Sequence, residues 1–529
     1  TKMFRLVLVL GAWTVTIGCA WAQNTPSPID VARRVDRLLV KESTAAPLPE
    51  LCDDATFLRR ACVDLTGKLP QPADVDAFNK DTAPAKRSRL VDRLLKGDAY
   101  AVNWGRYWRD VLTYHTPASG NYLRWELFDR WMIEQVRNNR RWSEIVTSMI
   151  TAEGPNDECA PVNFLTAHFG NTVEIAATTS RVFLGVQLQC AQCHDAKTEP
   201  WKREQFHELV AFFGRSRIIQ RKDVDGKGRG TPYAIEGRGE GQYFMPHKKD
   251  PTKLIEMTPR FLTGETISKD LNDIERREAL AKLLTSPNNP WFAKAYVNRM
   301  WSMLMGWGFY PTVNDLGTNL TPRHGDTLAL LTKEWTRAGY DMPWLFRTIT
   351  ATEAYQRRLQ PRPDSDSMAP LAVCPQRLRP EQIFEALTKA LGFDEHDKSI
   401  PSPAPSTAPA VARHTDLRNM VYQAFRVDPS TPPDEVHGTI PQALLMMNSA
   451  LVNTYVAATG KTFLAETLKK NMKDDEVLTA LYDRTLSRRP RAEEIDTCRR
   501  YLTNVNNRRE AFEDIYWSLV NSTEFLTKR

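Results

Sequence analysis

The feature that most constrains this chain is the spacing of its apolar residues, which recur every three to four positions in many short segments. In residues 29–39, for example, Val31, Val35 and Leu38 fall on one face of a helix. Such segments are separated by glycine or proline, which stop helices. The pattern therefore predicts a mainly α fold built from short helices. Further helices are predicted over residues 54–65, 85–95, 100–114, 122–138, 142–151, 173–189, 201–213, 276–284, 291–304, 327–338, 343–350, 475–486 and 491–526.

Residues 216–259 break this helical pattern. Short alternating stretches such as Tyr233-Ala234-Ile235 occur there, and alternation is typical of strands. Glycine clusters mark turns, so a small loop-rich or β insert is expected in this region. The glycines lie at positions 226, 228, 230, 237, 239 and 241.

The length of the chain, 529 residues, is too great for one ordinary core. We expect two helical domains, over residues 27–215 and 263–529, separated by the Gly-rich insert at 216–262. Residues 401–410 are low in complexity and are expected to form a surface loop.

The first 22 residues have the pattern of a secretory signal peptide. Lys2 and Arg5 precede an apolar stretch over residues 6–18, and Ala20-Trp21-Ala22 forms a small-residue cleavage pattern. We expect cleavage near Ala22 and a periplasmic or extracellular location. Lipidation at Cys19 and retention of an uncleaved anchor are the alternatives.

The charge balance is mildly basic, with 71 Lys and Arg against 64 Asp and Glu and a formal net charge of +7. No long basic run is present, so nucleic-acid binding is not expected. The charge suits an acidic partner protein, and it would also suit association with the cell surface or the membrane periphery.

The motif that carries chemistry is Cys190-Ala191-Gln192-Cys193-His194. In a C-x-x-C-H motif the two thiols can form thioether bonds to the vinyl groups of a haem, and the histidine is its proximal axial ligand. We therefore expect one covalent haem c, held by Cys190 and Cys193 with His194 on the iron. A Cys190–Cys193 disulfide and a metal site without haem are the alternatives.

The second axial ligand of such a haem is not apparent from the pattern. Met245, His247, His168 and His115 are weak candidates for a distal ligand, and a five-coordinate iron is the other option. On a helical wheel His207 lies away from the apolar face of its helix, so it is expected to be a surface residue.

Other chemistry finds less support in the sequence. There is no G-x-S-x-G, H-E-x-x-H or phosphate-loop motif.

An odd number of cysteines remains outside the signal peptide and the C-x-x-C-H motif, and their pairing cannot be read from the sequence. These residues are Cys52, Cys62, Cys159, Cys374 and Cys498.

Several longer segments resemble a known pair of domains. The first half is similar to the planctomycete-type secreted cytochrome-like domain, on the segments 57–60, 63–67, 104–112 and 182–195. The second half resembles the usual C-terminal partner of that domain, on the segments 289–293, 297–301, 306–308, 379–382, 439–448 and 486–490. Both domains are of unknown function. Many relatives have a second histidine two residues after the haem histidine, and this chain has Ala196 there.

The leading hypothesis is an exported c-type haem protein that transfers electrons to or from an unknown redox partner protein. A haem-dependent oxidoreductase is the second hypothesis, because the chain extends several hundred residues beyond the motif. A non-redox binding or scaffold protein outside the cytoplasm is the third, since fold and motif constrain function only loosely.

Overall fold

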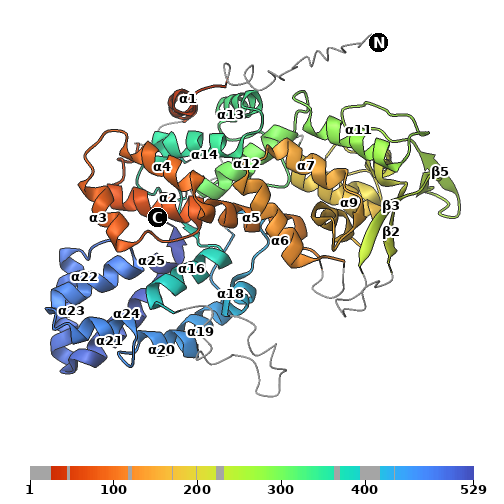
Figure 1. Cartoon of the computed structure of the whole chain (residues 1–529). Helices are drawn as coiled ribbons and strands as arrows, with labels where there is room; N and C mark the ends of the chain where they lie inside the picture. Colours follow the sequence, from red (N-terminus) through yellow and green to blue (C-terminus); the bar gives the residue numbers. More distant parts are fainter. Residues whose placement is uncertain are drawn as a thin grey trace, which may run out of the picture.

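The computed structural model describes residues 25–43, 48–116, 122–169, 171–197, 199–221, 232–317, 319–362, 370–393, 417–433 and 435–528. The expected signal peptide, the low-complexity loop at 401–410 and glycines 226, 228 and 230 lie outside these residues. Helices dominate the described part, and the sheets have only two or three strands, so the mainly α prediction is confirmed (Figure 1).

The first two helices begin at capping side chains, and the first one, Pro28–Glu42, is longer than the predicted 29–39. Ser27 caps a helix that starts at Pro28, and Asp53 accepts a hydrogen bond from the backbone of Thr56 at the start of the next. That second helix ends at Gly67, whose φ of 71° is the left-handed conformation that favours glycine. The helices are α1 (Pro28–Glu42), α2 (Asp54–Thr66), α3 (Pro72–Lys80), α4 (Lys86–Lys96), α5 (Asp98–Thr113), α6 (Trp125–Arg137) and α7 (Trp142–Ile150).

The part of the chain that leads to the insert is made of shorter elements. They are β1 (Gly154–Pro155), η1 (Ala160–Val162), α8 (Asn163–Thr166), α9 (Thr172–Thr179), η2 (Ser180–Leu184), η3 (Gln189–Gln192), α10 (Arg203–Val210) and η4 (Ala211–Phe213).

The insert forms two small antiparallel sheets, as the glycine pattern predicts. The strands β2 (Ser216–Gln220) and β3 (Tyr233–Gly237) pair with each other, and β1 pairs with the free edge of β3. The strands β4 (Tyr243–Pro246) and β5 (Leu254–Met257) form a separate hairpin.

The chain after the insert is helical again. It contains α11 (Asp273–Thr285), α12 (Phe292–Met305), α13 (Gly325–Arg337), α14 (Met342–Ala351), α15 (Glu353–Gln356), α16 (Pro380–Leu391), α18 (Leu417–Phe425), α19 (Ile440–Asn448), α20 (Ala450–Val456), α21 (Phe463–Lys469) and α22 (Asp474–Thr485). The periodic tail at 491–526 is three helices, α23 (Ala492–Val505), α24 (Arg508–Val520) and α25 (Thr523–Leu526). The break after α23 falls at Asn506, whose φ is 52°.

The larger core draws side chains from both sides of the insert. Its centre is an aromatic stack, in which the ring of Trp108 lies 4.1 Å from Trp142 and 5.3 Å from Tyr296, between ring centroids. Tyr296 in turn stacks on Trp335 at 4.4 Å. The stack therefore joins α5 and α7 to α12 and α13. The division into two domains at the insert stays a prediction.

A second, smaller core joins the last helices to the beginning of the chain. Apolar residues of α16, α20, α22 and α24 pack with Val63 of α2 and Leu69. Figure 1 shows α16 in teal and α20, α22 and α24 in blue, grouped below α2 and α3.

A buried ion pair connects the same regions. The strand β7 (Thr527–Lys528) pairs with β6 (Gln376–Arg377), and the Nζ of Lys528 lies 2.8 Å from a carboxylate oxygen of Asp64. Both side chains are 4% exposed. Tyr355 donates a hydrogen bond of 2.6 Å to the same carboxylate, so this charge has two partners inside the protein.

The structure corrects the predicted helix at 173–189. Asn171 caps its start as expected, but α9 passes into a π-helical turn, η2, and the helix ends at Gly185 with a φ of 61°. The carbonyl of Gly185 accepts a hydrogen bond of 2.8 Å from the backbone of Leu316. A Cβ at position 185 would lie 2.8 Å from the side chain of Leu316. Only glycine fits both the conformation and the close approach.

None of the described helices combines the length and the apolar run that a bilayer crossing requires.

Gly185→Ala should destabilise the protein more than a substitution at another left-handed glycine. Gly339 has a φ of 67° but nothing within 4 Å of a built Cβ, so Gly339→Ala isolates the conformational cost. We expect a loss of unfolding free energy of about 1 kcal/mol for Gly339→Ala and about 2–4 kcal/mol for Gly185→Ala. Denaturant unfolding of both variants measures the difference, and equal losses would contradict the close contact with Leu316.

Candidate functional site

The C-x-x-C-H segment lies on the short helix η3 and the turn that follows it. After Gly185 ends the preceding helix, Leu188 is buried, but Cys190, Cys193 and His194 are all exposed. The two thiols and the imidazole therefore lie on the surface of the described part of the chain, within one short turn.

The ring of His194 is held in one orientation by its own backbone neighbour. Its Nδ1 lies 2.8 Å from the carbonyl oxygen of Asp195. A carbonyl can only accept, so Nδ1 donates the proton and the lone pair of a neutral ring is on Nε2. Iron-ligating histidines commonly have this arrangement, with the second ring nitrogen donating to a carbonyl.

The middle of the motif is held by two side chains of α10. The carbonyl oxygen of Gln192 accepts hydrogen bonds from Nε2 of His207 at 3.1 Å and from Nε of Arg203 at 3.3 Å. On its other side, Nδ1 of His207 accepts from the hydroxyl of Tyr243 at 2.8 Å. Burial lowers the pKa of His207, which favours the neutral ring that these two partners require.

The expectation that His207 is a surface residue is wrong. The side chain is only 4% exposed, because η3 covers one part of its helix face and β4 covers another. The helical wheel considers one helix alone and cannot include these two covering segments. Tyr243 lies in the insert, 36 residues from His207, and no local pattern in the sequence points to it.

The residues after the motif are tied to the start of α10. A carboxylate oxygen of Asp195 accepts from the backbone N–H of Arg203 at 3.0 Å, and this bond is the first cause of the lowered pKa of Asp195. The backbone N–H of Ala196 donates to the carbonyl of Trp201 at 2.9 Å. Trp201 packs against Trp291, with ring centroids 5.9 Å apart. The motif is thus connected to the helices on both sides of the insert.

Two of the candidate distal ligands lie in or next to the β4–β5 hairpin. Met245 is 1% exposed and packs in a small apolar cluster with Ala211 and Met257. His247 is partly exposed, and its Nδ1 accepts from the backbone N–H of Lys249 at 3.3 Å. The charge of Lys248 lowers the pKa of Asp195, so this end of the hairpin lies near the motif.

The other two candidates have a different environment. His168 packs edge-on against Phe164, and its Nε2 is buried without a hydrogen-bond partner in the described part of the chain. Burial lowers the pKa of His168 to about 4, so the ring is neutral at pH 7. The Nε2 of His115 lies 3.4 Å from a carboxylate oxygen of Asp428. Burial alone would raise the pKa of Asp428, but hydrogen bonds from His115 and Ser430 lower it to about 2.

No disulfide joins two cysteines of the described residues. Burial raises the pKa of Cys62 to about 12, so this thiol is inert. Cys52, Cys62 and Cys374 are buried, and Cys159 and Cys498 are partly buried.

The residues of the motif fit a covalent haem in three respects. Two exposed thiols and an imidazole lie within five residues, the histidine has an oriented ring, and its Nε2 is directed away from the one protein contact of the ring. No group of three or more His, Cys, Asp and Glu side chains among the described residues has the arrangement of a metal site.

The fold and the motif define a mainly helical protein with one surface C-x-x-C-H segment between two sets of helices. Residues 34–217 match the family PSCyt2, described as a protein of unknown function (DUF1549). Residues 276–502 match PSD1, described as a protein of unknown function (DUF1553). The chain belongs to the proteins that join these two domains in this order, which confirms the resemblance inferred from the sequence. No curated protein and no solved structure matches the chain.

His207→Phe should loosen the motif, because phenylalanine keeps the ring but removes both hydrogen bonds. We expect the protein to lose about 1–3 kcal/mol of unfolding free energy, with faster hydrogen exchange at residues 190–195. His247→Phe is the control, since among the described residues the ring of His247 has one hydrogen bond, from the backbone N–H of Lys249, and none to the motif. Unchanged exchange at 190–195 in His207→Phe would contradict the positioning role.

The protein should lose stability in mild acid through His168. Because its pKa is about 4 when folded and ordinary when unfolded, the unfolded chain binds more protons below about pH 6.5. The free energy of unfolding therefore falls by about 3 kcal/mol in total as the pH falls from about 6.5 to 4, because the folded protein holds the ring of His168 neutral. His168→Phe should flatten this loss in urea titrations at several pH values, whereas His247→Phe should leave it unchanged.

Proposed function

We propose that this protein carries one covalent haem c and exchanges electrons with a partner protein outside the cytoplasm. Cys190 and Cys193 would form the thioether bonds, and Nε2 of His194 would be the proximal ligand of the iron. The haem, when bound, supplies one-electron redox chemistry, and the chain supplies its attachment, orientation and surroundings.

The observation that carries the proposal is the orientation of His194 beside two exposed thiols. Its Nδ1 is engaged by the Asp195 carbonyl at 2.8 Å, which directs Nε2 outward. Arg203 and His207 hold the Gln192 carbonyl between the two cysteines. The motif is therefore already in a fixed conformation through contacts that do not use the thiols or Nε2. Such preorganisation is what a prosthetic group needs from its anchoring residues.

Electron transfer is favoured over catalysis by the exposure of the anchoring residues. All three lie on the surface, so a group attached there is accessible to a docking protein. Redox partners typically meet through small, transient interfaces.

The surface around the motif also indicates the charge of that partner. Lys197, Lys202 and Lys248 are exposed, and the charges of Lys202 and Lys248 are both felt at Asp195. A basic surface favours encounter with an acidic protein. We therefore propose an acidic redox partner, in agreement with the basic balance of the whole chain.

The proposed location rests on the signal-peptide pattern of the first 22 residues. Attachment of haem c takes place outside the cytoplasm, so export and a C-x-x-C-H motif belong together in one chain.

The proposal is tested by producing the protein in a host that attaches haem c. We expect a haem-stained band on a denaturing gel and a pyridine haemochrome spectrum of about one haem per chain. Cys190→Ser with Cys193→Ser should abolish the stained band, because the thioethers are lost. His194→Ala should change the spectrum even where a thioether forms.

Cys498→Ser is the matched control, since Cys498 is a free, partly buried thiol in α23, outside the motif. It should keep the stained band at full intensity. A wild-type protein without haem from a competent host would overturn the proposal, and a Cys190–Cys193 disulfide would then be the state to examine.

A further inference from the structure

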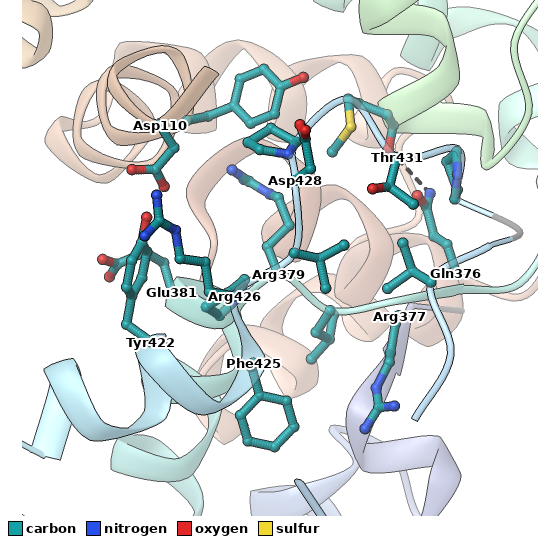
Figure 2. Close-up of a pocket in the computed structure, with 18 residues that line it drawn as sticks. Asp110, Gln376, Arg377, Arg379, Glu381, Tyr422, Phe425, Arg426, Asp428 and Thr431 are labelled. Atoms are coloured by element: carbon teal, nitrogen blue, oxygen red, sulfur yellow. Dashed lines mark hydrogen bonds between the residues drawn. The ribbon is translucent and has the colours of Figure 1, made fainter. Parts of the chain in front are cut away.

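A cavity of about 100 Å³ lies where the turn between β6 and α16 meets α5, α18 and the segment after α18. None of the residues that line it belongs to the C-x-x-C-H segment, so the inference drawn from this cavity does not depend on the haem proposal. Figure 2 shows Arg379 in the middle of this cavity, with Asp110, Tyr422 and Arg426 on one side and Arg377 turned away on the other.

Arg379 has no ion pair with an acid among the described residues. Within this part of the chain its side chain makes one hydrogen bond, from Nη2 to the Oδ1 of Asn103 at 2.6 Å, and no carboxylate lies within 4.0 Å of it. The guanidinium lies over the rings of Tyr107 and Trp104, at 5.0 Å and 5.4 Å from their centroids. A guanidinium has five N–H donors, so most of the donors of Arg379 remain available to a ligand.

The carboxylates that line the same cavity already have partners. Asp110 accepts from Arg109 at 2.7 Å, and Glu381 pairs with Arg106 at 3.2 Å and with Arg418. Asp428 pairs with His115. Asp110 and Glu381 attract the Arg379 guanidinium only from beyond 4.0 Å, and burial lowers the pKa of that arginine. An anion bound directly to Arg379 would offset the cost of this burial.

The remaining wall of the cavity is apolar. Leu378, Phe425, Pro429 and Val436 line it beside the charged residues. A wider hollow of about 490 Å³ adjoins the cavity and shares with it Gln376, Arg377, Pro433 and Val436. A ligand with an apolar body can therefore extend from Arg379 past Phe425 toward this second hollow.

We propose that this cavity binds a small organic monocarboxylate, with its carboxylate on Arg379 and its apolar body against Phe425, Pro429 and Val436. A guanidinium can bind a carboxylate through two parallel hydrogen bonds. The three acids of the lining, Asp110, Glu381 and Asp428, pair with cations outside it, namely Arg109, Arg106, Arg418 and His115. One negative charge is therefore favoured at Arg379, and a dianion such as a phosphate monoester is disfavoured by the nearby carboxylates.

The test measures binding of phenylacetate to the full chain by ligand-observed NMR and calorimetry. Phenylacetamide has the same shape without the charge, and phenyl phosphate has the same ring with a dianionic group. We expect saturable binding of phenylacetate at least tenfold tighter than binding of either comparison compound.

Two variants locate the site. Arg379→Met should weaken phenylacetate binding at least tenfold and leave the weak binding of phenylacetamide unchanged. Val436→Trp fills the apolar part without changing a charge and should also abolish binding. Arg358→Met is the control, because Arg358 is exposed and pairs with Glu50 outside the cavity.

Four results would each overturn the proposal. They are no saturable binding of phenylacetate to the folded wild-type chain, equal binding of phenylacetate and phenylacetamide, tighter binding of phenyl phosphate, and full binding by a folded Arg379→Met. Hydrogen exchange of α16 confirms that each variant is folded, and should Arg379→Met fail this check, Val436→Trp decides the location.

Discussion

The aromatic stack of Trp108, Trp142, Tyr296 and Trp335 is the contact on which the rest of the structure depends. It joins helices that precede the insert to helices that follow it, and all four side chains are almost completely buried. Large aromatic side chains contribute more apolar area to a core than any other type. Phe183, the second-last residue of η2, packs against the same Trp142. The segment that leads to the C-x-x-C-H motif is thus anchored on a core that both halves of the chain build together.

The position of the motif therefore depends on residues that are distant in sequence. The helix before the motif ends at Gly185, which contacts Leu316. The carbonyl of Gln192 in the motif is held by His207 of α10. His207 is in turn hydrogen-bonded to Tyr243 of β4. The part of the chain before the insert supplies the motif, and α10, the insert and the second half of the chain together hold it in place.

Local signals in the sequence predicted the local structure well. The apolar spacing predicts most of the helices before residue 351, and the glycine pattern predicts the small strands of the insert. The errors occur where a tertiary contact decides. Gly185 ends a helix that periodicity extends to residue 189, and His207 is buried by segments that a helical wheel cannot include. The cavity around Arg379 could not be predicted, because α5, the β6–α16 turn and α18 meet only in the folded chain.

The ion pair between Lys528 and Asp64 has a consequence for the order in which the protein can assemble. Helix α2 buries one face in the larger core and contributes Val63 to the smaller one. The packing of α2 is therefore incomplete until the helices of the smaller core and Lys528 are in place. Contacts between such distant residues require closure of very long loops and slow the formation of the native state. A nascent chain with this topology cannot complete its smaller core until the segment that carries Lys528 has been synthesised, so its N-terminal helices wait with an apolar face uncovered.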